Sequence, residues 1–312
     1  MINFKHIKHW NKGQMKTFIS GLTTYLHQYY KEFNNPLQAI RFKIGQLEEI
    51  NLDFKDEQIP TIHLTKAGKH ILTSYINSKY NHDEKYIDLY RDILNQLNTD
   101  NEYVDFKGIK VPNKAEYVWL FFEFYGSYDL INYENRTVID IGSNIGDTSL
   151  NFANHGATVY AYEVVPYIHE ISKDLLELNP QYDGKIYYFN KAVASKKGTI
   201  TISYDEEDAN IGGASIYSDE EKGFEIETLS IQDILDENNI EADVLKMDCE
   251  GCEYNIILTA DLTKFKDVIL EYHNVEGHTP QELVDKLKKE GFTVKQFPDR
   301  LINNLGIIHA YK

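Results

Sequence analysis

The sequence is short of positive charge. Its 312 residues include 32 Lys and Arg against 49 Asp and Glu, which leaves a formal net charge of -17 at pH 7. A general nucleic-acid-binding protein holds the phosphate backbone with clustered Lys and Arg. The composition therefore argues against nucleic acid as a partner and favours a small or neutral substrate.

Long apolar runs are also missing. No stretch approaches the roughly 18 apolar residues that cross a bilayer, and the first residues lead into mixed polar sequence without the apolar core of a signal peptide. We therefore expect a soluble, cytoplasmic protein with no transmembrane segment. The 42% hydrophobic and 13% aromatic content suffices for one or two globular domains. The oligomeric state is left open.

Cysteine is scarce as well, and Cys249 and Cys252 form a single Cys-x-x-Cys pair. A structural zinc site needs about four ligands, and no second pair exists, so zinc is disfavoured. A thioredoxin-like redox pair would sit at a helix N-terminus, which fits, but the thioredoxin order of elements is absent. We favour two small residues that fill positions around the acidic pattern of residues 248–253.

The sequence does contain a buried strand that ends in a glycine-punctuated turn, at residues 138–148. Asp140 lies at the end of this strand. Gly142 and Gly146 let the backbone approach a ligand, and the helix that follows presents unpaired N–H groups at its start. The spacing Asp-x-Gly-x-x-x-Gly differs from the Gly-x-Gly-x-x-Gly of dinucleotide-binding proteins. It favours a neutral or cationic ligand without phosphates.

From about Thr137 onward, strand-like and helix-like segments alternate, which predicts a doubly wound α/β fold with a mostly parallel sheet. The expected strands are 137–141, 158–163, 185–192, 243–248, 267–272, 292–297 and 306–311. The expected helices are 147–155, 165–178, 231–238, 252–260 and 280–290. The connection between the last two strands is too short for a parallel crossover, so these seven strands should end in an antiparallel pair.

Residues 194–230 depart from this alternation. Residues 199–203 and 224–229 alternate strictly between apolar and polar side chains, which predicts an inserted β-hairpin of half-exposed strands. The long connection between them is acidic and rich in glycine. It fits either a solvated loop or a lid near the site.

Residues 1–112 predict a mainly helical N-terminal region, and residues 113–312 a separate α/β domain. The helical spacing of apolar residues is clearest at 18–33 and 71–97. Aromatic residues at this spacing favour core packing over a partner surface. Gly108 and Pro112 punctuate the segment at which we place the boundary.

Polar residues at the ends of the predicted strands should share one rim of the sheet, where open α/β folds bind ligands. Glu163 ends the second strand, where its carboxylate can accept both hydroxyl protons of a ribose. This fits an adenosine but does not separate NAD from S-adenosylmethionine. Asn190 and Ala192 close the third strand, where they can meet the adenine edge, although core packing explains Ala192 equally well.

The fourth and fifth strands end in a group of acids and one imidazole. Asp248, Glu250 and Glu253 lie within six residues, where they repel one another unless a cation, a hydrogen-bond donor or a protonated neighbour offsets them. A positively charged ligand would do so. Glu253 also suits the start of the next helix, whose dipole favours negative charge. Glu271 and His273 follow on the fifth strand, and His273 belongs either to the site or to the surface or core.

Together these residues resemble the FkbM family of S-adenosylmethionine-dependent methyltransferases. The resemblance covers residues 125–291. It is most specific at 138–148 (Asp-x-Gly-x-Asn-x-Gly), 245–253 (Lys-x-Asp-x-Glu-Gly-x-Glu) and 270–273 (Glu-x-His). It implies a class I, Rossmann-like methyltransferase domain at residues 113–312, S-adenosylmethionine as the cofactor, and methyl transfer to oxygen. The implied acceptor is a hydroxyl on a sugar or another small molecule, including a glycolipid.

The cofactor-binding residues expected on this basis are Asp140, Gly142, Asn144, Gly146, Glu163, Asn190, Ala192 and Asp248. A hydroxyl acceptor must also lose its proton, and Asp248, Glu250 and His273 are the candidate catalytic residues. His273 is the favoured base because its ordinary pKa, about 6.5, lies nearest neutrality.

A divalent cation held by Asp248, Glu250 and Glu271 is compatible with these residues, but nothing in their spacing demands one, and no metal site is predicted. Two other functions compete. An NAD-type oxidoreductase is supported by Glu163 and by the alternating order of strands and helices, but it lacks its three-glycine fingerprint. A non-catalytic nucleotide-binding protein on the same fold is the other alternative.

Overall fold

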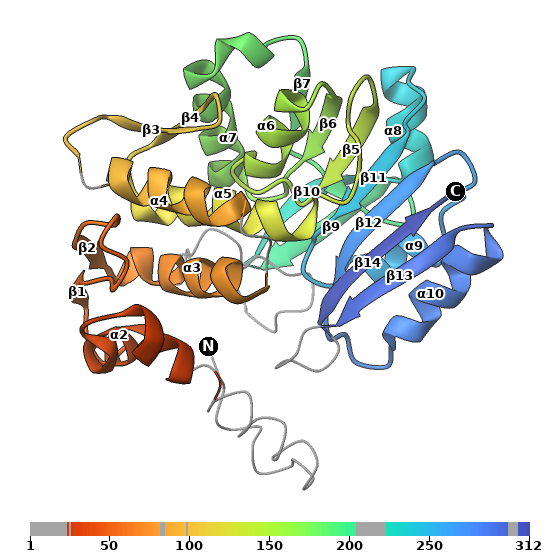
Figure 1. Cartoon of the computed structure of the whole chain (residues 1–312). Coiled ribbons are helices and arrows are strands. Elements are labelled where there is room, and N and C mark those ends of the chain that lie inside the picture. Colours follow the sequence, from red (N-terminus) through yellow and green to blue (C-terminus); the bar gives the residue numbers. More distant parts are fainter. Residues whose placement is uncertain (1–23, 25, 82–84, 98, 204–222, 299–304) are drawn as a thin grey trace, which may run out of the picture. The chain divides into compact units, whose positions relative to one another are not determined.

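The computed structural model describes residues 24–312 apart from 25, 82–84, 98, 204–222 and 299–304 (Figure 1). The chain divides into two compact units, one ending at Ser127 and the other beginning at Tyr128. The sequence places its boundary earlier, between residues 112 and 113. The helix that lies between these two positions packs against helices of the first unit.

The first unit is mainly helical, as expected. Its labelled helices are α2 (Pro36–Lys43), η2 (Lys66–Lys69), α3 (His70–Asn81), α4 (Lys85–Leu97) and α5 (Ala115–Ser127). It also contains two antiparallel pairs that the sequence did not predict: β1 (Glu49–Leu52) with β2 (Ile62–Thr65), and β3 (Tyr103–Phe106) with β4 (Ile109–Pro112). Each of these strands has four residues, too few for a clear period-2 pattern.

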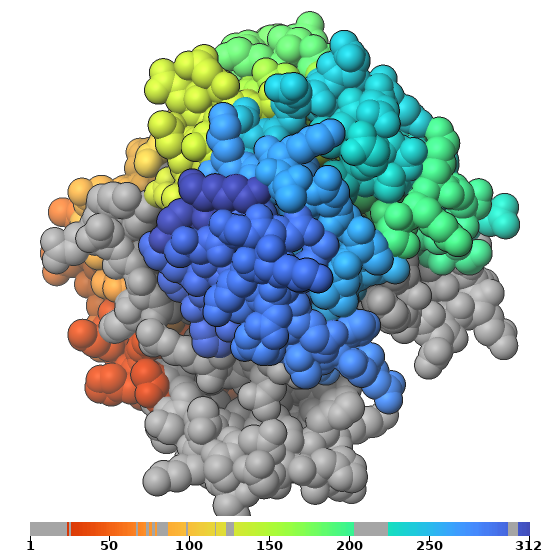
Figure 2. Space-filling model, turned by 90° about the vertical axis from the view of Figure 1, so that its right-hand side faces the viewer, coloured from red at the N-terminus to blue at the C-terminus, as the bar shows by residue number. Residues whose placement is uncertain are grey.

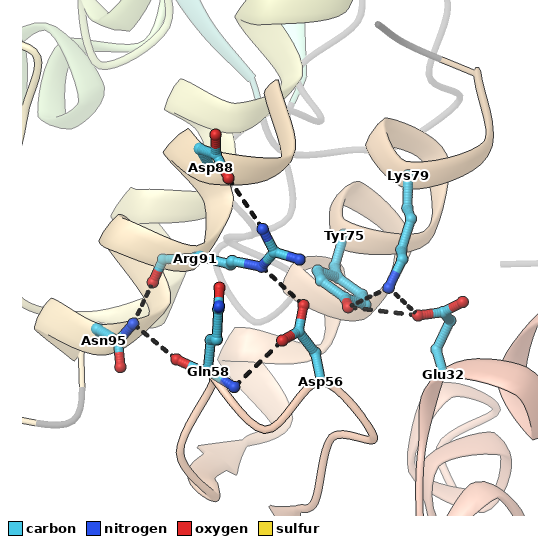
Figure 3. A network of polar contacts seen from close by, with 8 residues as sticks. All are labelled: Glu32, Asp56, Gln58, Tyr75, Lys79, Asp88, Arg91 and Asn95. Atoms are coloured by element: carbon cyan, nitrogen blue, oxygen red, sulfur yellow. Dashed lines mark hydrogen bonds and ion pairs between the residues drawn. The ribbon is translucent and has the colours of Figure 1, made fainter. Parts of the chain in front are cut away.

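Aromatic and charged side chains hold this first unit together. Tyr29 and Phe33, at the end of a segment that is helical over residues 26–32, are fully buried, so the expectation of core packing is confirmed for them. Lys79 on α3 forms an ion pair of 2.5 Å with the buried Glu32. Figure 3 shows this pair beside a second one, in which the Arg91 guanidinium on α4 contacts a carboxylate of the β1–β2 connection. Residues 18–23 of the expected first helix lie outside the described residues.

The second unit is built on a sheet that has seven strands within the described residues. The strand order is β13-β14-β12-β11-β5-β6-β7, and β14 runs antiparallel to both of its neighbours while the remaining pairs are parallel. The strands are β5 (Thr137–Ile141), β6 (Thr158–Tyr162), β7 (Ile186–Phe189), β11 (Val244–Met247), β12 (Asp267–Tyr272), β13 (Thr293–Pro298) and β14 (Gly306–Tyr311). Six of the seven predicted strands and the antiparallel final pair are confirmed, and the third strand ends at Phe189 instead of residue 192.

Helices cover both faces of this sheet. They are α6 (Asp147–Asn154), α7 (Pro166–Leu178), η3 (Pro180–Tyr182), α8 (Ile231–Asn238), α9 (Glu253–Ile257) and α10 (Pro280–Lys289). Ile139 and Ile141 of β5 pack with α8, α9 and α10 in the main hydrophobic core. Asp140, which alternation places on the opposite face, accepts hydrogen bonds from the first turn of α6. The sheet is therefore doubly wound, as predicted.

The inserted hairpin is confirmed as well. β9 (Gly198–Ser203) pairs antiparallel with β10 (Gly223–Leu229), and β10 pairs parallel with the short β8 (Ala192–Val193). The expected third strand at 185–192 is thus two strands, β7 and β8, which belong to different sheets. The proposed lid, residues 204–222, lies outside the described residues.

In the seven-stranded sheet, β13 is an edge strand, and most of its side chains are exposed. Figure 2 shows the C-terminal segments that include β13 and α10, in blue, as one continuous surface. In the described part of the chain, no helix has the length and apolar character that crossing a bilayer would require.

Candidate functional site

The loop after β5 has a backbone shape that only glycine tolerates at two positions. Gly142 and Gly146 adopt φ angles of 70° and 86°. A Cβ at residue 142 would lie 1.8 Å from the Asp248 carbonyl oxygen, and one at residue 146 would lie 2.1 Å from the Tyr188 hydroxyl. Both approaches are far inside van der Waals contact. The loop is therefore packed tightly against the end of β11 on one side and against β7 on the other.

The Asp140 carboxylate holds this loop in place through an ion pair and hydrogen bonds. Its carboxylate is completely buried, forms a 2.9 Å ion pair with the buried Lys246, and accepts hydrogen bonds of 2.7 Å from Thr148 and Ser149. The Lys246 ammonium also donates to the Gly142 carbonyl at 2.8 Å. Since its carboxylate is enclosed by these partners, Asp140 holds the loop in position.

Lys246 contacts this loop, and the sequence analysis did not single it out as a site residue. Burial lowers its pKa, but Asp140 and Asp248 outweigh burial, so the net shift is upward and the ammonium stays charged. A buried charge persists only with such partners. A single Lys inside the apolar strand Val244–Met247 was the available signal, because an unpaired Lys would not be stable there.

Glu163, which directly follows β6, contacts the same loop. The Glu163 carboxylate is buried and accepts backbone N–H groups from Asn144 at 3.0 Å and from Val165 at 2.8 Å. Burial raises its pKa against these hydrogen bonds. The Asn190 amide donates to the Glu163 carbonyl at 2.8 Å. Ala192, by contrast, is buried in a small core with Ile202 and Ile226, so its side chain does not join the site.

Two buried polar side-chain atoms of the loop have no hydrogen-bond partner among the described residues. They are Ser143 Oγ and Asn144 Oδ1. Asn144 also holds a positive φ of 50°, an unusual conformation for a residue with a side chain. Buried polar groups without partners are rare in folded proteins, and strained backbone gathers at ligand sites. The loop therefore has the properties of a binding site for a polar ligand.

The ends of β11 and β12 bring the predicted acids and imidazole together. His273 Nδ1 lies 3.1 Å from Glu253 Oε1, and Nε2 lies 3.5 Å from Glu250 Oε2 and 3.9 Å from Asp248 Oδ1. The Tyr128 hydroxyl donates to Asp248 Oδ2 at 3.3 Å. His273 therefore belongs to the site, with only 16% of its side chain exposed. We call His273 and the four residues that surround it the acid–imidazole cluster; the four are Tyr128, Asp248, Glu250 and Glu253.

The carboxylates of the cluster raise the pKa of His273 above the ordinary value of an imidazole. Burial lowers the pKa of His273, but Glu253, Asp248 and Glu250 outweigh burial and raise it to about 9. At neutral pH the imidazole of this cluster carries its proton. The ordinary value, on which His273 was favoured as a base, does not apply in this environment.

The two cysteines of the same loop are joined. Cys249 and Cys252 form a disulfide, so the expectation that they serve only as small packing residues is wrong. The bond closes the short turn between β11 and α9. Within this turn Glu250 adopts a φ of 53° and Gly251 a φ of 109°. The disulfide therefore closes a segment that carries Glu250, and Asp248 and Glu253 lie directly on either side of it.

Residues 140–294 match the family model of the methyltransferase FkbM domain. Among solved structures, the chain is similar to methyltransferase FkbM from Methylobacillus flagellatus, with 14% identity and a TM-score of 0.43 over 78% of this chain and 58% of that one. It therefore spans little more than half the length of that relative. None of the curated proteins matches the sequence significantly.

Two further solved structures resemble the chain. Precorrin-6y C5,15-methyltransferase from Geobacter metallireducens is 16% identical over 68% of this chain and 95% of that one, with a TM-score of 0.37. Magnesium protoporphyrin IX methyltransferase from Synechocystis, with bound S-adenosylmethionine, is 12% identical over 78% and 97%, with a TM-score of 0.38. The α/β fold with a seven-stranded, mostly parallel sheet is the class I methyltransferase fold expected from the sequence.

Proposed function

The chain belongs to the methyltransferase FkbM family through residues 140–294, and from this premise we propose that it transfers a methyl group from S-adenosylmethionine to a hydroxyl oxygen. The proposed acceptor is a sugar or another small molecule, including a glycolipid, and the proposed location is the cytoplasm. One observation carries the proposal. The tight loop with its unpartnered polar atoms and the acid–imidazole cluster meet at the carboxyl ends of adjacent parallel strands.

The loop suits the cofactor in both shape and charge. In this proposal residues 142–146 hold the methionine part of S-adenosylmethionine, which gives Ser143 Oγ and Asn144 Oδ1 the hydrogen-bond partners that they do not find among the described residues. Each oxygen of Glu163 accepts one backbone N–H and keeps further lone pairs for the ribose hydroxyls. Asp248 is the member of the cluster whose backbone lies against Gly142 of the loop, and in this proposal its carboxylate attracts the positive sulfonium.

Methyl transfer asks the protein for alignment more than for new chemistry. The sulfonium carbon is already electrophilic, so holding the acceptor oxygen in line with it and excluding water can supply up to about 7–11 kcal/mol. The acceptor hydroxyl also loses a proton. Asp248 and Glu250 are the proposed acceptors of this proton, and the protonated His273 lies beside both of them, with Glu253 fixing the orientation of its ring.

Cofactor binding is the first test. Isothermal titration of the full chain with S-adenosylhomocysteine should give one site, and titration with NAD should give no heat. Binding of NAD without S-adenosylhomocysteine would instead support the oxidoreductase alternative. No specific observation favours that alternative, since the loop lacks the three-glycine fingerprint.

The second test identifies the reaction. The protein is incubated with S-adenosylmethionine labelled in its methyl group and with a cell extract, and the labelled product is analysed. We expect a methyl ether, which survives mild alkali, on a sugar-containing or other small compound. Label on nitrogen, or in an alkali-labile ester, would contradict hydroxyl methylation. Cofactor binding without any labelled product would support the non-catalytic alternative.

The third test concerns the cluster. His273→Ala should leave S-adenosylhomocysteine affinity within about twofold of the natural protein and lower turnover by about 100-fold, a typical contribution for a group that handles a proton. The control is His155→Ala, at an exposed position beyond α6. If His273→Ala lost S-adenosylhomocysteine affinity as strongly as it lost turnover, this residue would serve the cofactor and not the acceptor.

A further inference from the structure

Side chains with metal-ligand chemistry gather at the ends of β11 and β12. Asp248, Glu271 and His273 each offer one ligand atom, and these atoms lie within 4.8 Å of one another. Ligand atoms on opposite sides of one bound ion lie about 4–5 Å apart, because metal–ligand distances are roughly 2.0–2.6 Å. The three residues therefore have the dimensions of one coordination sphere.

The imidazole is oriented as a metal-bound histidine is. Such a histidine commonly donates its other ring N–H to a carboxylate, which fixes the ring and its tautomer. Here Glu253, which is completely buried, lies 3.1 Å from Nδ1 and leaves Nε2 directed at Asp248 and Glu250. The distance from Nε2 to the Asp248 carboxylate, 3.9 Å, is long for a hydrogen bond and ordinary for two ligands of one ion.

The charge around the imidazole points the same way. Carboxylates of Asp248, Glu250 and Glu253 all lie within 4 Å of this one ring. A proton on His273 offsets one of these negative charges, whereas a dication bound to Nε2 offsets two. A cation at this position also lets Asp248 and Glu271 approach each other, since both carboxylates are then attracted to the same centre.

We propose that Asp248, Glu271 and His273 bind a divalent transition-metal cation of the Mn²⁺ type. An imidazole nitrogen with two carboxylates is a donor set for such ions, whereas Mg²⁺ and Ca²⁺ take oxygen ligands. Glu271 lies on β12, and Asp248 and His273 directly follow the last residues of β11 and β12.

The role of this cation rests on the proposed function. A divalent cation that binds the acceptor oxygen lowers the pKa of its hydroxyl. The proton then passes to Glu250, which lies beside Nε2 and is not one of the three ligands. The acceptor oxygen forms its bond to the methyl carbon, the sulfur–methyl bond breaks, and the sulfonium becomes a neutral thioether. His273 is a ligand in this scheme, and Glu250 is the base.

Metal binding can be measured without any turnover. The full chain, freed of metal with a chelator, is titrated with Mn²⁺ while electron paramagnetic resonance follows the free ion. We expect one Mn²⁺ per chain, and little displacement by equimolar Mg²⁺. Glu271→Gln and His273→Gln should each weaken Mn²⁺ binding at least tenfold, and Glu253→Gln should weaken it about tenfold through the ring orientation. Glu276→Gln removes an exposed charge three residues after His273 in the sequence and should bind Mn²⁺ as the natural protein does.

The outcomes separate the two proposals. S-adenosylhomocysteine titrations of the same samples report whether the variants keep their folded cofactor site. If the natural protein binds S-adenosylhomocysteine but no Mn²⁺, or if Glu271→Gln and His273→Gln bind Mn²⁺ like Glu276→Gln, the metal site is overturned and the proposed methyl transfer stands. If Mn²⁺ binds as described and S-adenosylhomocysteine does not, the proposed function fails and the metal site remains.

Discussion

Backbone clearance distinguishes Gly142, in the loop after β5, from Gly277 in another turn of the second unit. Gly142 and Gly277 both have positive φ angles, 70° and 82°. A Cβ at residue 142 meets the backbone of Asp248, whereas a Cβ at residue 277 meets nothing within 4 Å. Backbone cannot move aside as the end of a flexible side chain can. The two positions therefore separate the cost of an unfavourable φ from the cost of losing the loop geometry.

Gly142→Ala should abolish S-adenosylhomocysteine binding, with at least a 100-fold loss of affinity by isothermal titration. The reason is the displacement of the loop away from the end of β11. Gly277→Ala is the matched control: it carries a similar φ penalty of about 1 kcal/mol and should bind normally. Equal affinity of the two variants would show that the loop does not hold the cofactor.

Asp147 gives a pH-dependent prediction with a defined sign. Burial raises its pKa to about 7, Lys246 counteracts this, and Asp140 adds to it. Because the folded value exceeds the ordinary 3.8, ionisation of Asp147 disfavours the fold above about pH 7. Asp147→Asn should therefore stabilise the protein at pH 8.

The gain should shrink as the pH falls from about 7 and vanish near pH 4, where the aspartate is protonated in both states. Urea unfolding at intervals between pH 4 and 8 measures this difference. A stability difference that does not change with pH would contradict the raised pKa.

Helices and strands form where local signals agree with burial. α8 shows such agreement: Ser230 caps it by accepting the Asp233 N–H at 3.1 Å, and Asp233 accepts the Ser230 N–H at 2.9 Å. Ile231, Ile234 and Leu235 lie on its buried side. This capping box fixes the point where the inserted hairpin ends and the chain returns to the sheet.

Ser230→Ala should destabilise the second unit by about 1 kcal/mol, the usual cost of losing an N-cap hydroxyl. Gln232→Ala, at an exposed position in the same first turn, should cost much less. Chemical denaturation followed by circular dichroism compares the two. Similar losses in both variants would show that the cap contributes little.

At the scale of the whole molecule, all the proposed cofactor and catalytic residues belong to the second unit. The Asp267 carboxylate connects three segments of the sheet through hydrogen bonds. Asp267 on β12 receives hydrogen bonds from His309 on β14, at 2.9 Å, and from Arg136, which precedes β5. Burial raises the pKa of Asp267, but these two hydrogen bonds outweigh burial and lower it overall.

Asp267→Asn should cost about 2 kcal/mol of unfolding free energy at pH 7, the scale of hydrogen bonds to a charged group. A lowered pKa stabilises the fold above the ordinary value of 3.8, and this stabilisation is lost as the pH falls through the folded value. The cost should therefore shrink below about pH 4. Asp285→Asn, exposed on α10, is the control, and an equal loss there would contradict the proposed role of Asp267.

The sequence alone was enough to predict most of the second unit, although it placed the start of that unit at residue 113 instead of Tyr128. Alternating apolar segments separated by glycine stops report burial and length directly, so six of the seven strands, the hairpin and the antiparallel final pair were predicted, whereas the end of the third strand was not. Strand ends carry ligand residues in such folds, which made Glu163, Asp248 and His273 recognisable. Their residue types, together with the glycine spacing, indicated the cofactor class.

Only the tertiary structure decided what each side chain faces. Asp140 turns inward to Lys246, Ala192 packs in a separate core, and Cys249 bonds to Cys252. The pKa of His273 likewise depends on three carboxylates from other positions in the chain. The physical reason is range: periodicity and spacing report local backbone and burial, whereas ion pairs, hydrogen bonds and pKa values depend on neighbours that come together only when the chain folds.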